Sequence, residues 1–338
     1  MKITISIPFW LRHHNRQLYS ALYFCEKERV ELKVLRHDET GVWNGIGEGP
    51  ILMVNGKTAY LDVSDDSVFD TTPSLYDFYF KRSLLNITAP NVYPMGFHQV
   101  FTYKPISLIR KMSLKVLTHP RSAVELIRAT DFTERLTNQS HFTRDYRNLK
   151  LNRDDHQGRV IFYTRLWDPD LVIDVEEKKR RMIQNEFRIG ACRIIRENFK
   201  NSTVGLFPDV IAKRLAPDLL MNEKDQSTPR YFQQLRVADI GIADDGLKDT
   251  PGAKIGEYVF FRKCVITTPI NTLIHDFKEG VNYLSTRNRS DYQSIPELIE
   301  SCISNKRYLE IIEMNDIWSK KHLDPYNYFK SILDIMGV

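Results

Sequence analysis

The chain is poor in cysteine and has no long apolar run. Its four cysteines, Cys25, Cys192, Cys264 and Cys302, are scattered over 338 residues and form no pair with metal-ligand spacing. We therefore expect free thiols and a reducing, cytoplasmic compartment. No segment approaches the roughly 18 consecutive apolar residues of a membrane-spanning helix. The first apolar stretch, ITISIPFWL, is interrupted by Pro8 and lacks a basic leader and a cleavage site, so we expect a strand there and no signal peptide.

Signals for nucleic-acid binding are also missing. The sequence has no zinc-finger spacing, no aromatic–basic repeat and no internal repeat. Its formal net charge is +5 and its pI is about 8.8. This mild excess suits an anionic small molecule or an anionic membrane surface, but it is too small to indicate nucleic acid.

A strand–GxGxxG–helix unit is absent, which argues against a dehydrogenase. The stretch GIGEGP at 45–50 has part of that pattern, but the strand-like ILMV follows it in place of a helix. Without a helix N-terminus, a phosphate has no dipole to bind. The next residues, ILMVNGKTAYLDV, predict a β-hairpin, because Asn55-Gly56 is a preferred pair for a type I′ turn between two strand-like runs.

The second half of the chain alternates between strand-like and helix-like segments. The polar stretch 148–159 separates it from the first half, and the length of the chain suits two domains. The alternation predicts an α/β fold with a parallel sheet covered by helices on both faces. Ligands of such sheets bind outside the carboxyl ends of the strands.

One segment of this half, DIGIADDGLKDTPGAKIGEYVFFRKCVITTP, suits an anionic ligand. Thr250 is expected to cap the helix, with Pro251 as its first residue. The positive end of the helix dipole would then attract an anion, and Lys254 would add a full charge. The N–H groups pointing at the anion would be those of Gly252, Ala253 and Lys254.

Two acids belong to the same segment. Glu257 lies one turn into the expected helix on the face of Lys254, where its carboxylate could accept hydrogen bonds from both hydroxyls of a ribose. Asp249 precedes the helix and could meet a sugar beyond the phosphates. Gly246 and Gly252 are expected to let a ligand approach the backbone closely. A second interpretation is open: Lys254 and Glu257 form a plain i,i+3 ion pair, and Asp249 only caps the helix.

In these segments the sequence resembles glycosyltransferases of the GT-B fold, notably the large retaining family four type, in a branch that builds bacterial surface polysaccharides. The resemblance covers most of residues 51–285 and is most specific at 237–285. It implies two Rossmann-like domains facing a cleft, with an acceptor domain at 1–155, a donor domain at 156–318, and a last helix at 319–338 packing back on the first domain. The motifs that carry it are NGKTAYLDVSDD, FYFKRSL and VYPMGF in the first half, and FYTRLWDPD, APDLL, ADIGIADDGL and GAKIGEYVFFRKCVITTPI in the second.

The resemblance implies transfer of a sugar from a nucleoside-diphosphate sugar to a glycan or lipid-linked glycan, with retention, without a metal and without another cofactor. Glu257 matches the glutamate that binds the ribose. Asp249 matches the acid, usually a glutamate, that contacts the donor sugar. Arg165 matches an arginine that reaches the donor phosphates. The family's partner lysine is missing, because Trp167 and its neighbours follow, and Lys254 is the candidate replacement. An acceptor of this kind implies peripheral contact with the inner membrane.

The first half offers candidates for the acceptor side. His98, His13 or His14 could face the reacting sugar, and Lys81 with Arg82 could hold an acidic or phosphate-bearing acceptor. Structural or solvated roles are open for all five.

Two other functions also fit. Asp168-Pro169-Asp170 is an acid-x-acid motif of the kind that binds a divalent metal in glycosyltransferases of the GT-A fold, or else a plain helix start. The chain could also be a nucleotide-binding regulatory or scaffolding protein without turnover.

Overall fold

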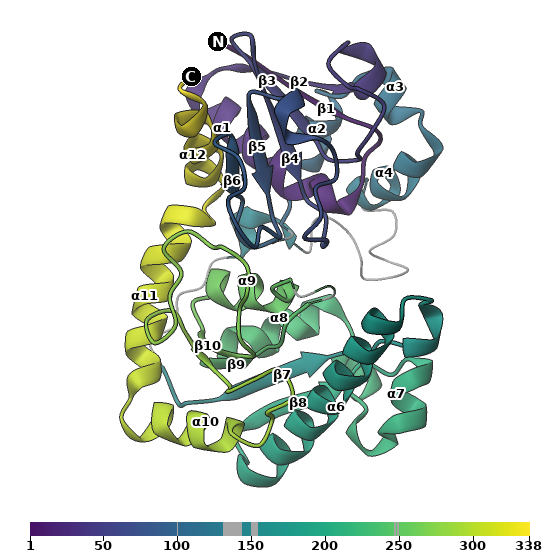
Figure 1. The fold of residues 1–338 in the computed structure, drawn as a ribbon. Coiled ribbons are helices and arrows are strands. Elements are labelled where there is room, and N and C mark those ends of the chain that lie inside the picture. Colours follow the sequence, from purple (N-terminus) through teal and green to yellow (C-terminus); the bar gives the residue numbers. More distant parts are fainter. Residues whose placement is uncertain (100, 131–143, 150–154, 247, 249) are drawn as a thin grey trace. The chain divides into compact units, whose positions relative to one another are not determined.

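The structure is a computed structural model that describes residues 1–99, 101–130, 144–149, 155–246, 248 and 250–338. The chain divides into two compact units, both drawn in Figure 1. The first contains Met1–Lys150, Thr272–His275 and Lys320–Val338, and the second contains Leu151–Asn271 and Asp276–Ser319. No helix in the described ranges is both long and apolar enough to cross a membrane.

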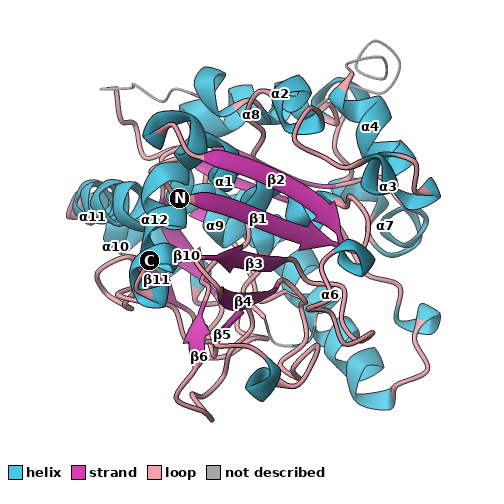
Figure 2. Cartoon of the chain, turned by 90° about the horizontal axis from the view of Figure 1, so that it is seen from above, coloured by secondary structure: helices cyan, strands magenta, loops and turns pink. Residues whose placement is uncertain are grey.

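The first unit has a six-stranded sheet in the order β2-β1-β3-β4-β5-β6. Figure 2 shows these strands side by side. Only β3 runs antiparallel to its neighbours. The predicted hairpin is confirmed: Asn55 and Gly56 join β3 to β4 with φ of 49° and 80°, the left-handed angles of a type I′ turn. The strands are β1 Lys2–Ile7, β2 Glu31–Arg36, β3 Ile51–Val54, β4 Lys57–Asp62, β5 Phe78–Lys81 and β6 Val92–Pro94.

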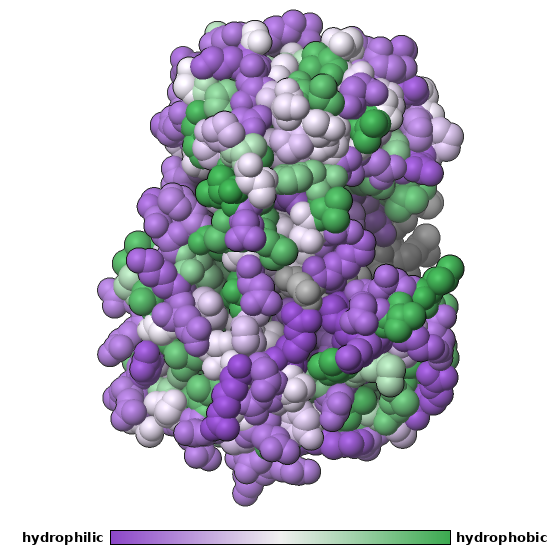
Figure 3. Space-filling view, in the orientation of Figure 1, coloured by the Kyte–Doolittle hydropathy of each residue, from purple (hydrophilic) through white to green (hydrophobic). Residues whose placement is uncertain are grey.

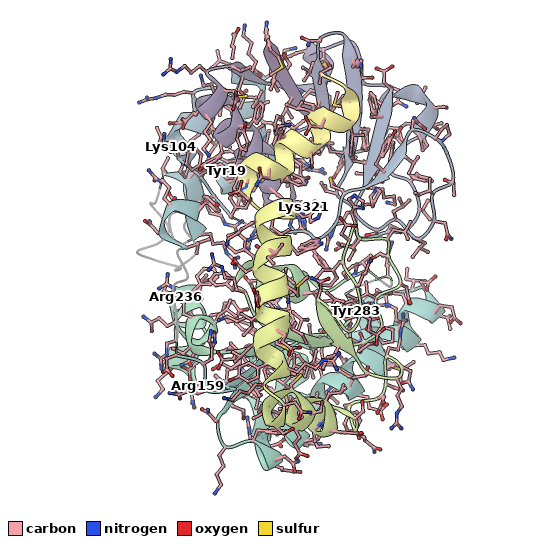
Figure 4. The ribbon with its side chains drawn as sticks, turned by 90° about the vertical axis from the view of Figure 1, so that its left-hand side faces the viewer. Tyr19, Lys104, Arg159, Arg236, Tyr283 and Lys321 are labelled. Atoms are coloured by element: carbon pink, nitrogen blue, oxygen red, sulfur yellow. The ribbon has the colours of Figure 1, made fainter. Side chains whose placement is uncertain are left out.

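The last helix of the chain belongs to the first unit. It packs against α1, where Phe24 stacks on Tyr326 with ring centroids 5.3 Å apart. Arg16 of α1 adds a second contact, because its guanidinium lies 3.8 Å from the ring centroid of Tyr328. Figure 4 labels Tyr19, another buried residue of α1. The helices of this unit include α1 Asn15–Glu28, α2 Pro105–Ile109, α3 Leu114–Leu117, α4 Ala123–Ala129 and α12 Pro325–Met336.

The second unit has a five-stranded, fully parallel sheet in the order β11-β10-β9-β7-β8. Its strands are β7 Val160–Thr164, β8 Ser202–Leu206, β9 Ile240–Ile242, β10 Cys264–Thr267 and β11 Tyr283–Ser285. Its helices include α6 Val175–Asn198, α7 Val210–Leu215, α8 Thr228–Val237, α9 Ala253–Phe260, α10 Ile295–Ser304 and α11 Arg307–His322, whose end from Lys320 on belongs to the first unit. Helices α10 and α11 are separated at Lys306, whose backbone is left-handed with φ of 52°.

Both faces of this sheet are covered by helices. On one face Phe162 of β7 packs in a core with Phe187 of α6 and Ile299 of α10. On the other face Tyr163 contacts Tyr231 of α8, with ring centroids 6.3 Å apart. The α/β prediction is therefore confirmed, and the buried strands are as apolar as a doubly covered parallel sheet requires.

The strand order of the second unit reverses next to β7. The chain moves from β7 to β8 on one side, and then crosses to β9, β10 and β11 on the other. In open parallel sheets this switch point leaves a crevice outside the carboxyl ends of the two strands, where ligands bind. The ends of β7 and β9 are therefore where a ligand site is expected.

Candidate functional site at the carboxyl edge of the second sheet

A buried ion pair joins the ends of β7 and β9. Arg188 of α6 donates two hydrogen bonds to the carboxylate of Asp244, with Nε–Oδ2 of 2.7 Å and Nη2–Oδ1 of 3.0 Å. Its remaining Nη1 donates to the carbonyl oxygen of Arg165 at 2.5 Å. Both side chains of the pair are 7% exposed. One guanidinium therefore fixes the two strand ends that border the switch point.

The next residue, Asp245, is held at the same edge by neighbouring elements. Its backbone N–H donates to Thr268 Oγ at 2.8 Å, and Gln184 donates to its carbonyl oxygen. The carboxylate oxygen Oδ2 accepts no hydrogen bond from the residues that the structure describes, although Arg289 Nε lies 3.5 Å and Arg180 Nη1 3.9 Å away. Burial, and then the neighbouring Asp244, raise the pKa of Asp245 to about 6 despite these two arginines.

Arg165 directly follows β7. Its exposed guanidinium lies over the ring of Phe207, 5.1 Å from the centroid, and 5.9 Å from the centroid of Trp167. Among the described residues no carboxylate pairs with it. An exposed arginine held between two aromatic side chains can bind an anion from solvent without first breaking an ion pair.

Helix α9 begins at the same edge, but not as predicted. Gly252 is the N-cap and Ala253 the first helical residue, so Thr250 and Pro251 precede the helix and the cap prediction is wrong. Thr250 is buried, and its carbonyl oxygen accepts the N–H of Gly246.

The space that a side chain would take at Gly246 and Gly252 is filled by other atoms of the chain, so it shows no room for a ligand. A Cβ on Gly252 would lie 2.3 Å from the carbonyl oxygen of Asp244, and one on Gly246 would lie 2.8 Å from Thr250 Oγ1. The absence of a side chain at Gly252 therefore lets the start of α9 pack against the end of β9. This contact brings the helix N-terminus to the switch point.

Lys254 and Glu257 form the i,i+3 pair that the spacing allows, with Nζ–Oε2 of 3.1 Å. The structure adds a third member. Tyr231 of α8 donates its hydroxyl to the same Oε2 at 2.6 Å, and Lys254 Nζ lies 3.6 Å from the centroid of its ring. The Glu257 side chain is 14% exposed and that of Lys254 is 35% exposed. The carboxylate is thus fixed in orientation and still partly open to solvent.

The remaining acidic candidates are Asp249, Asp168 and Asp170. Asp249 lies outside the described residues. Asp168 accepts the N–H of Asp170 at 3.0 Å and so begins a 3-10 turn, while Asp170 pairs with Lys178 at 2.7 Å. The hydrogen bond from Lys178 lowers the pKa of the exposed Asp170 carboxyl. The helix-start interpretation of this motif is therefore the one that the structure shows.

No metal-like cluster of three His, Cys, Asp or Glu side chains is present among the residues that the structure describes.

The first unit brings together three of the acceptor candidates. His13 follows β1 and His98 follows β6, and their ring centroids lie 5.5 Å apart. Arg82, directly after β5, is buried and pairs with Asp65. Burial, and then Arg82 and His13, hold the pKa of His98 well below its usual range. The imidazole of His98 is therefore neutral at physiological pH, with one ring nitrogen that donates a hydrogen bond and one that accepts a hydrogen bond.

Two other candidates from the first unit are structural. Lys81 is fully buried, and its Nζ lies 2.9 Å from the carboxylate of Asp62, which also accepts the hydroxyl of Tyr79 at 2.6 Å. His14 is 1% exposed, and burial lowers its pKa to about 3. Lys81 and His14 are therefore both buried in the first unit, and Lys81 is paired with Asp62 rather than solvated.

Comparison with known proteins gives only remote similarity. No family model matches the chain, and no curated protein matches it significantly. Among solved structures, a glycosyltransferase from Rickettsia africae ESF-5 aligns with 95% of this chain and 79% of its own, at 10% identity and a TM-score of 0.43. Two structures of the wall teichoic acid polymerase TagF align with 78% and 94% of this chain, at 11% identity and TM-scores of 0.28 and 0.31. This chain covers 56% and 69% of those two structures.

Proposed function

We propose that the chain is a glycosyltransferase that takes a sugar from a nucleoside-diphosphate sugar bound at the carboxyl edge of the second sheet. The observation that carries this proposal is the arrangement of Glu257, which is fixed by Tyr231 and Lys254 on a helix that begins at the switch point. A fixed, partly exposed carboxylate suits the two hydroxyls of a ribose. The motifs shared with GT-B glycosyltransferases support the same assignment.

The cations of this edge suit the leaving diphosphate. When the bond between the anomeric carbon and the diphosphate oxygen breaks, negative charge grows on that oxygen. Arg165, Lys254 and the N-terminus of α9 would stabilise the charge, because they are already in place before the reaction. The acceptor hydroxyl forms the new bond and loses its proton, so no protein group becomes covalently attached.

We assign the acceptor, a glycan or lipid-linked glycan, to the His13–His98–Arg82 cluster of the first unit. The neutral imidazole of His98 can accept the hydroxyl proton, and Arg82, which is paired with Asp65, helps burial to keep that imidazole neutral. Retention at the anomeric carbon and independence of metal are carried into this proposal from the sequence resemblance.

Release of a nucleoside diphosphate from a panel of sugar nucleotides tests the proposal, with a bacterial lipid and glycan extract as the source of acceptor and EDTA present. We expect one nucleotide class to be released faster when extract is added. Binding of a nucleotide without release under any of these conditions would instead identify a regulatory protein. Release that requires Mg²⁺ or Mn²⁺ would favour the metal-dependent alternative at Asp168 and Asp170.

A further inference from the structure

Two charged side chains meet at the carboxyl edge of the second sheet in a contact that the proposed function does not use. Arg289 follows β11 and Asp245 follows β9, so their contact bridges the end of β10, the strand between them. Arg289 Nε lies 3.5 Å from Asp245 Oδ2, and the Arg289 side chain is 30% exposed. In the space-filling view, hydrophilic side chains gather where Figure 1 draws the end of β7, on the same edge of the sheet (Figure 3).

The carboxylate of Asp245 is buried and incompletely hydrogen-bonded. Its side chain is 7% exposed. Thr268 donates its hydroxyl to Oδ1 at 3.2 Å, while Oδ2 accepts no hydrogen bond from the part of the chain that the structure describes. A buried carboxylate of this kind stays ionised only with the help of nearby cations, because burial favours the neutral acid.

The two arginines near Oδ2 differ in what they can still bind. Arg180 is 9% exposed and its nitrogens are engaged: Nε and Nη2 donate to Glu177 at 2.8 and 3.0 Å, and Nη1 donates to the carbonyl oxygen of Gly246 at 2.6 Å. Arg289 is nearer to Oδ2 and more exposed. Arg289 is therefore the one that an anion from solvent can reach, and a guanidinium binds phosphate in the geometry in which it binds a carboxylate.

This pair lies next to the helix that we assign to the phosphates. Asp245 forms a β-bridge with Pro251, and Pro251 directly precedes Gly252, the N-cap of α9. A diphosphate at the N-terminus of α9 would therefore bring negative charge toward both Arg289 and Asp245. The arginine would be attracted by that charge, whereas the ionised carboxylate would be repelled by it.

Protonation of Asp245 removes this repulsion. Burial, and then Asp244, raise the pKa of Asp245 to about 6, and Arg289 opposes them more strongly than Arg180 does. A ligand that draws Arg289 away and adds negative charge would raise this pKa further. Within the described residues, the charged groups that face Asp245, directly or through a paired partner, are Asp244 after β9, Glu177, Arg180 and Arg188 on α6, and Arg289 after β11.

We propose that a bound diphosphate draws Arg289 from Asp245 to a phosphate oxygen, and that the buried carboxylate then takes up a proton from solvent. This coupling rests on the nucleotide site proposed above and adds a phosphate-binding arginine and a pH dependence to it. Asp245 is a positioning residue, because it holds Arg289 at the edge of the sheet in the free protein. No bond of the ligand breaks, and the proton moves from water to Asp245, so affinity rises as pH falls.

Calorimetric titration at pH 7, in buffers of different ionisation enthalpy and with EDTA, measures the proton uptake. The ligands are UDP, GDP, ADP, CMP and inorganic pyrophosphate. We expect the wild type to take up about 0.3–0.9 proton more than Asp245→Asn for each ligand bound, because the free carboxyl is mostly ionised at pH 7. The ligand's own titration cancels in this difference. Between pH 6.5 and pH 7.5 the affinity of the wild type should fall about two- to eightfold more than that of the variant.

Arg289→Gln tests the same coupling at a more exposed position. It should weaken binding about tenfold, the loss of a charge-assisted hydrogen bond. It should also lose the extra proton uptake, because Asp245 without Arg289 already holds its proton. Arg287→Gln is the matched control, since Arg287 is an exposed arginine two residues earlier in the same loop, and it should bind like wild type. The unfolding midpoints of both arginine variants should equal that of the wild type, so that weaker binding reports the contact and not the fold.

The outcomes separate this coupling from the nucleotide site itself. Nucleotide binding with equal proton uptake by wild type and Asp245→Asn would overturn the coupling and leave the nucleotide site in place. Equal affinities of Arg289→Gln and Arg287→Gln would overturn it in the same way. No binding of any of the five ligands to the wild type, at pH 6.5 or pH 7.5, would overturn both the coupling and the proposed function.

Discussion

The guanidinium of Arg188 meets the carboxylate of Asp244 at two points and, with its third nitrogen, the carbonyl of Arg165. These contacts tie the ends of two neighbouring strands to one helix at the place where the strand order reverses. The position of Arg165, and therefore of the proposed phosphate site, depends on this buried pair.

Arg188→Ala should lower the free energy of unfolding by about 3–5 kcal/mol, because it leaves the buried carboxylate of Asp244 without its partner. Urea denaturation measures the change. Arg193→Ala on the same helix is the control: its pair with Asp218 is exposed, so the cost should stay below about 1 kcal/mol. Equal costs for the two variants would show that the buried pair does not hold this edge together.

Asp245 should make stability depend on pH. Its folded-state pKa of about 6 lies above the ordinary value of 3.8, so the folded protein keeps this proton more tightly than the unfolded chain. Its contribution is therefore fully present below about pH 4 and is lost as pH rises through 6. Asp245→Asn removes this titrating carboxyl. The free energy of unfolding of the variant, relative to that of the wild type, should therefore rise by on the order of 2–3 kcal/mol between pH 4 and pH 7. A difference that stays constant across this range would contradict the assignment.

Tyr231→Phe should weaken nucleotide binding about 3- to 10-fold, because Glu257 loses the hydroxyl that orients it while the ring beneath Lys254 remains. Calorimetric titration of the nucleotide measures the effect. Tyr163→Phe is the control. The ring of Tyr163 lies next to that of Tyr231 but, among the described residues, does not hydrogen-bond to Glu257, so the nucleotide affinity of this variant should match wild type. If both variants bind like wild type, the orientation of Glu257 does not matter for the ligand.

His98→Gln should slow sugar transfer at least tenfold while leaving nucleotide affinity unchanged, because His98 belongs to the first unit and the proposed nucleotide site to the second. The pH–rate profile of the wild type should show no step near pH 6.5 from this residue, since its pKa is well below that value. His119→Gln is the control, because the ring of His119 stacks on Phe9. Transfer at the wild-type rate by His98→Gln would remove the acceptor assignment.

Local rules predicted much of the fold. Asn55-Gly56 specifies its turn because both residues readily adopt left-handed backbone angles. The alternation of strands and helices after residue 156 follows from the spacing of apolar residues. The i,i+3 contact of Lys254 with Glu257 is equally local and was correctly placed. These features could be predicted because each depends on residues within one or two helical turns or strands.

Features that depend on packing were missed. Lys81 was a candidate for holding an acidic acceptor, with structural and solvated roles left open. It stands opposite Asp62 on the neighbouring strand, and this partner is visible only once the register is known. Tyr231 reaches Glu257 from another helix, and Gly252 is required by the carbonyl of Asp244 rather than by its own turn. The doubled acid Asp244-Asp245 directly after a strand was the available signal for the polar edge.

The most direct test is calorimetric titration of UDP, GDP, ADP and CMP in EDTA, with wild type, Glu257→Ala and the exposed control Glu300→Ala. We expect one nucleoside diphosphate to bind tightly without metal, and Glu257→Ala to weaken it by about 10- to 150-fold, the loss of a charge-assisted hydrogen bond. Glu300→Ala should bind like wild type. Affinity that Glu257→Ala leaves unchanged, or no binding of any of the four nucleotides, would contradict a nucleotide site at this edge of the sheet.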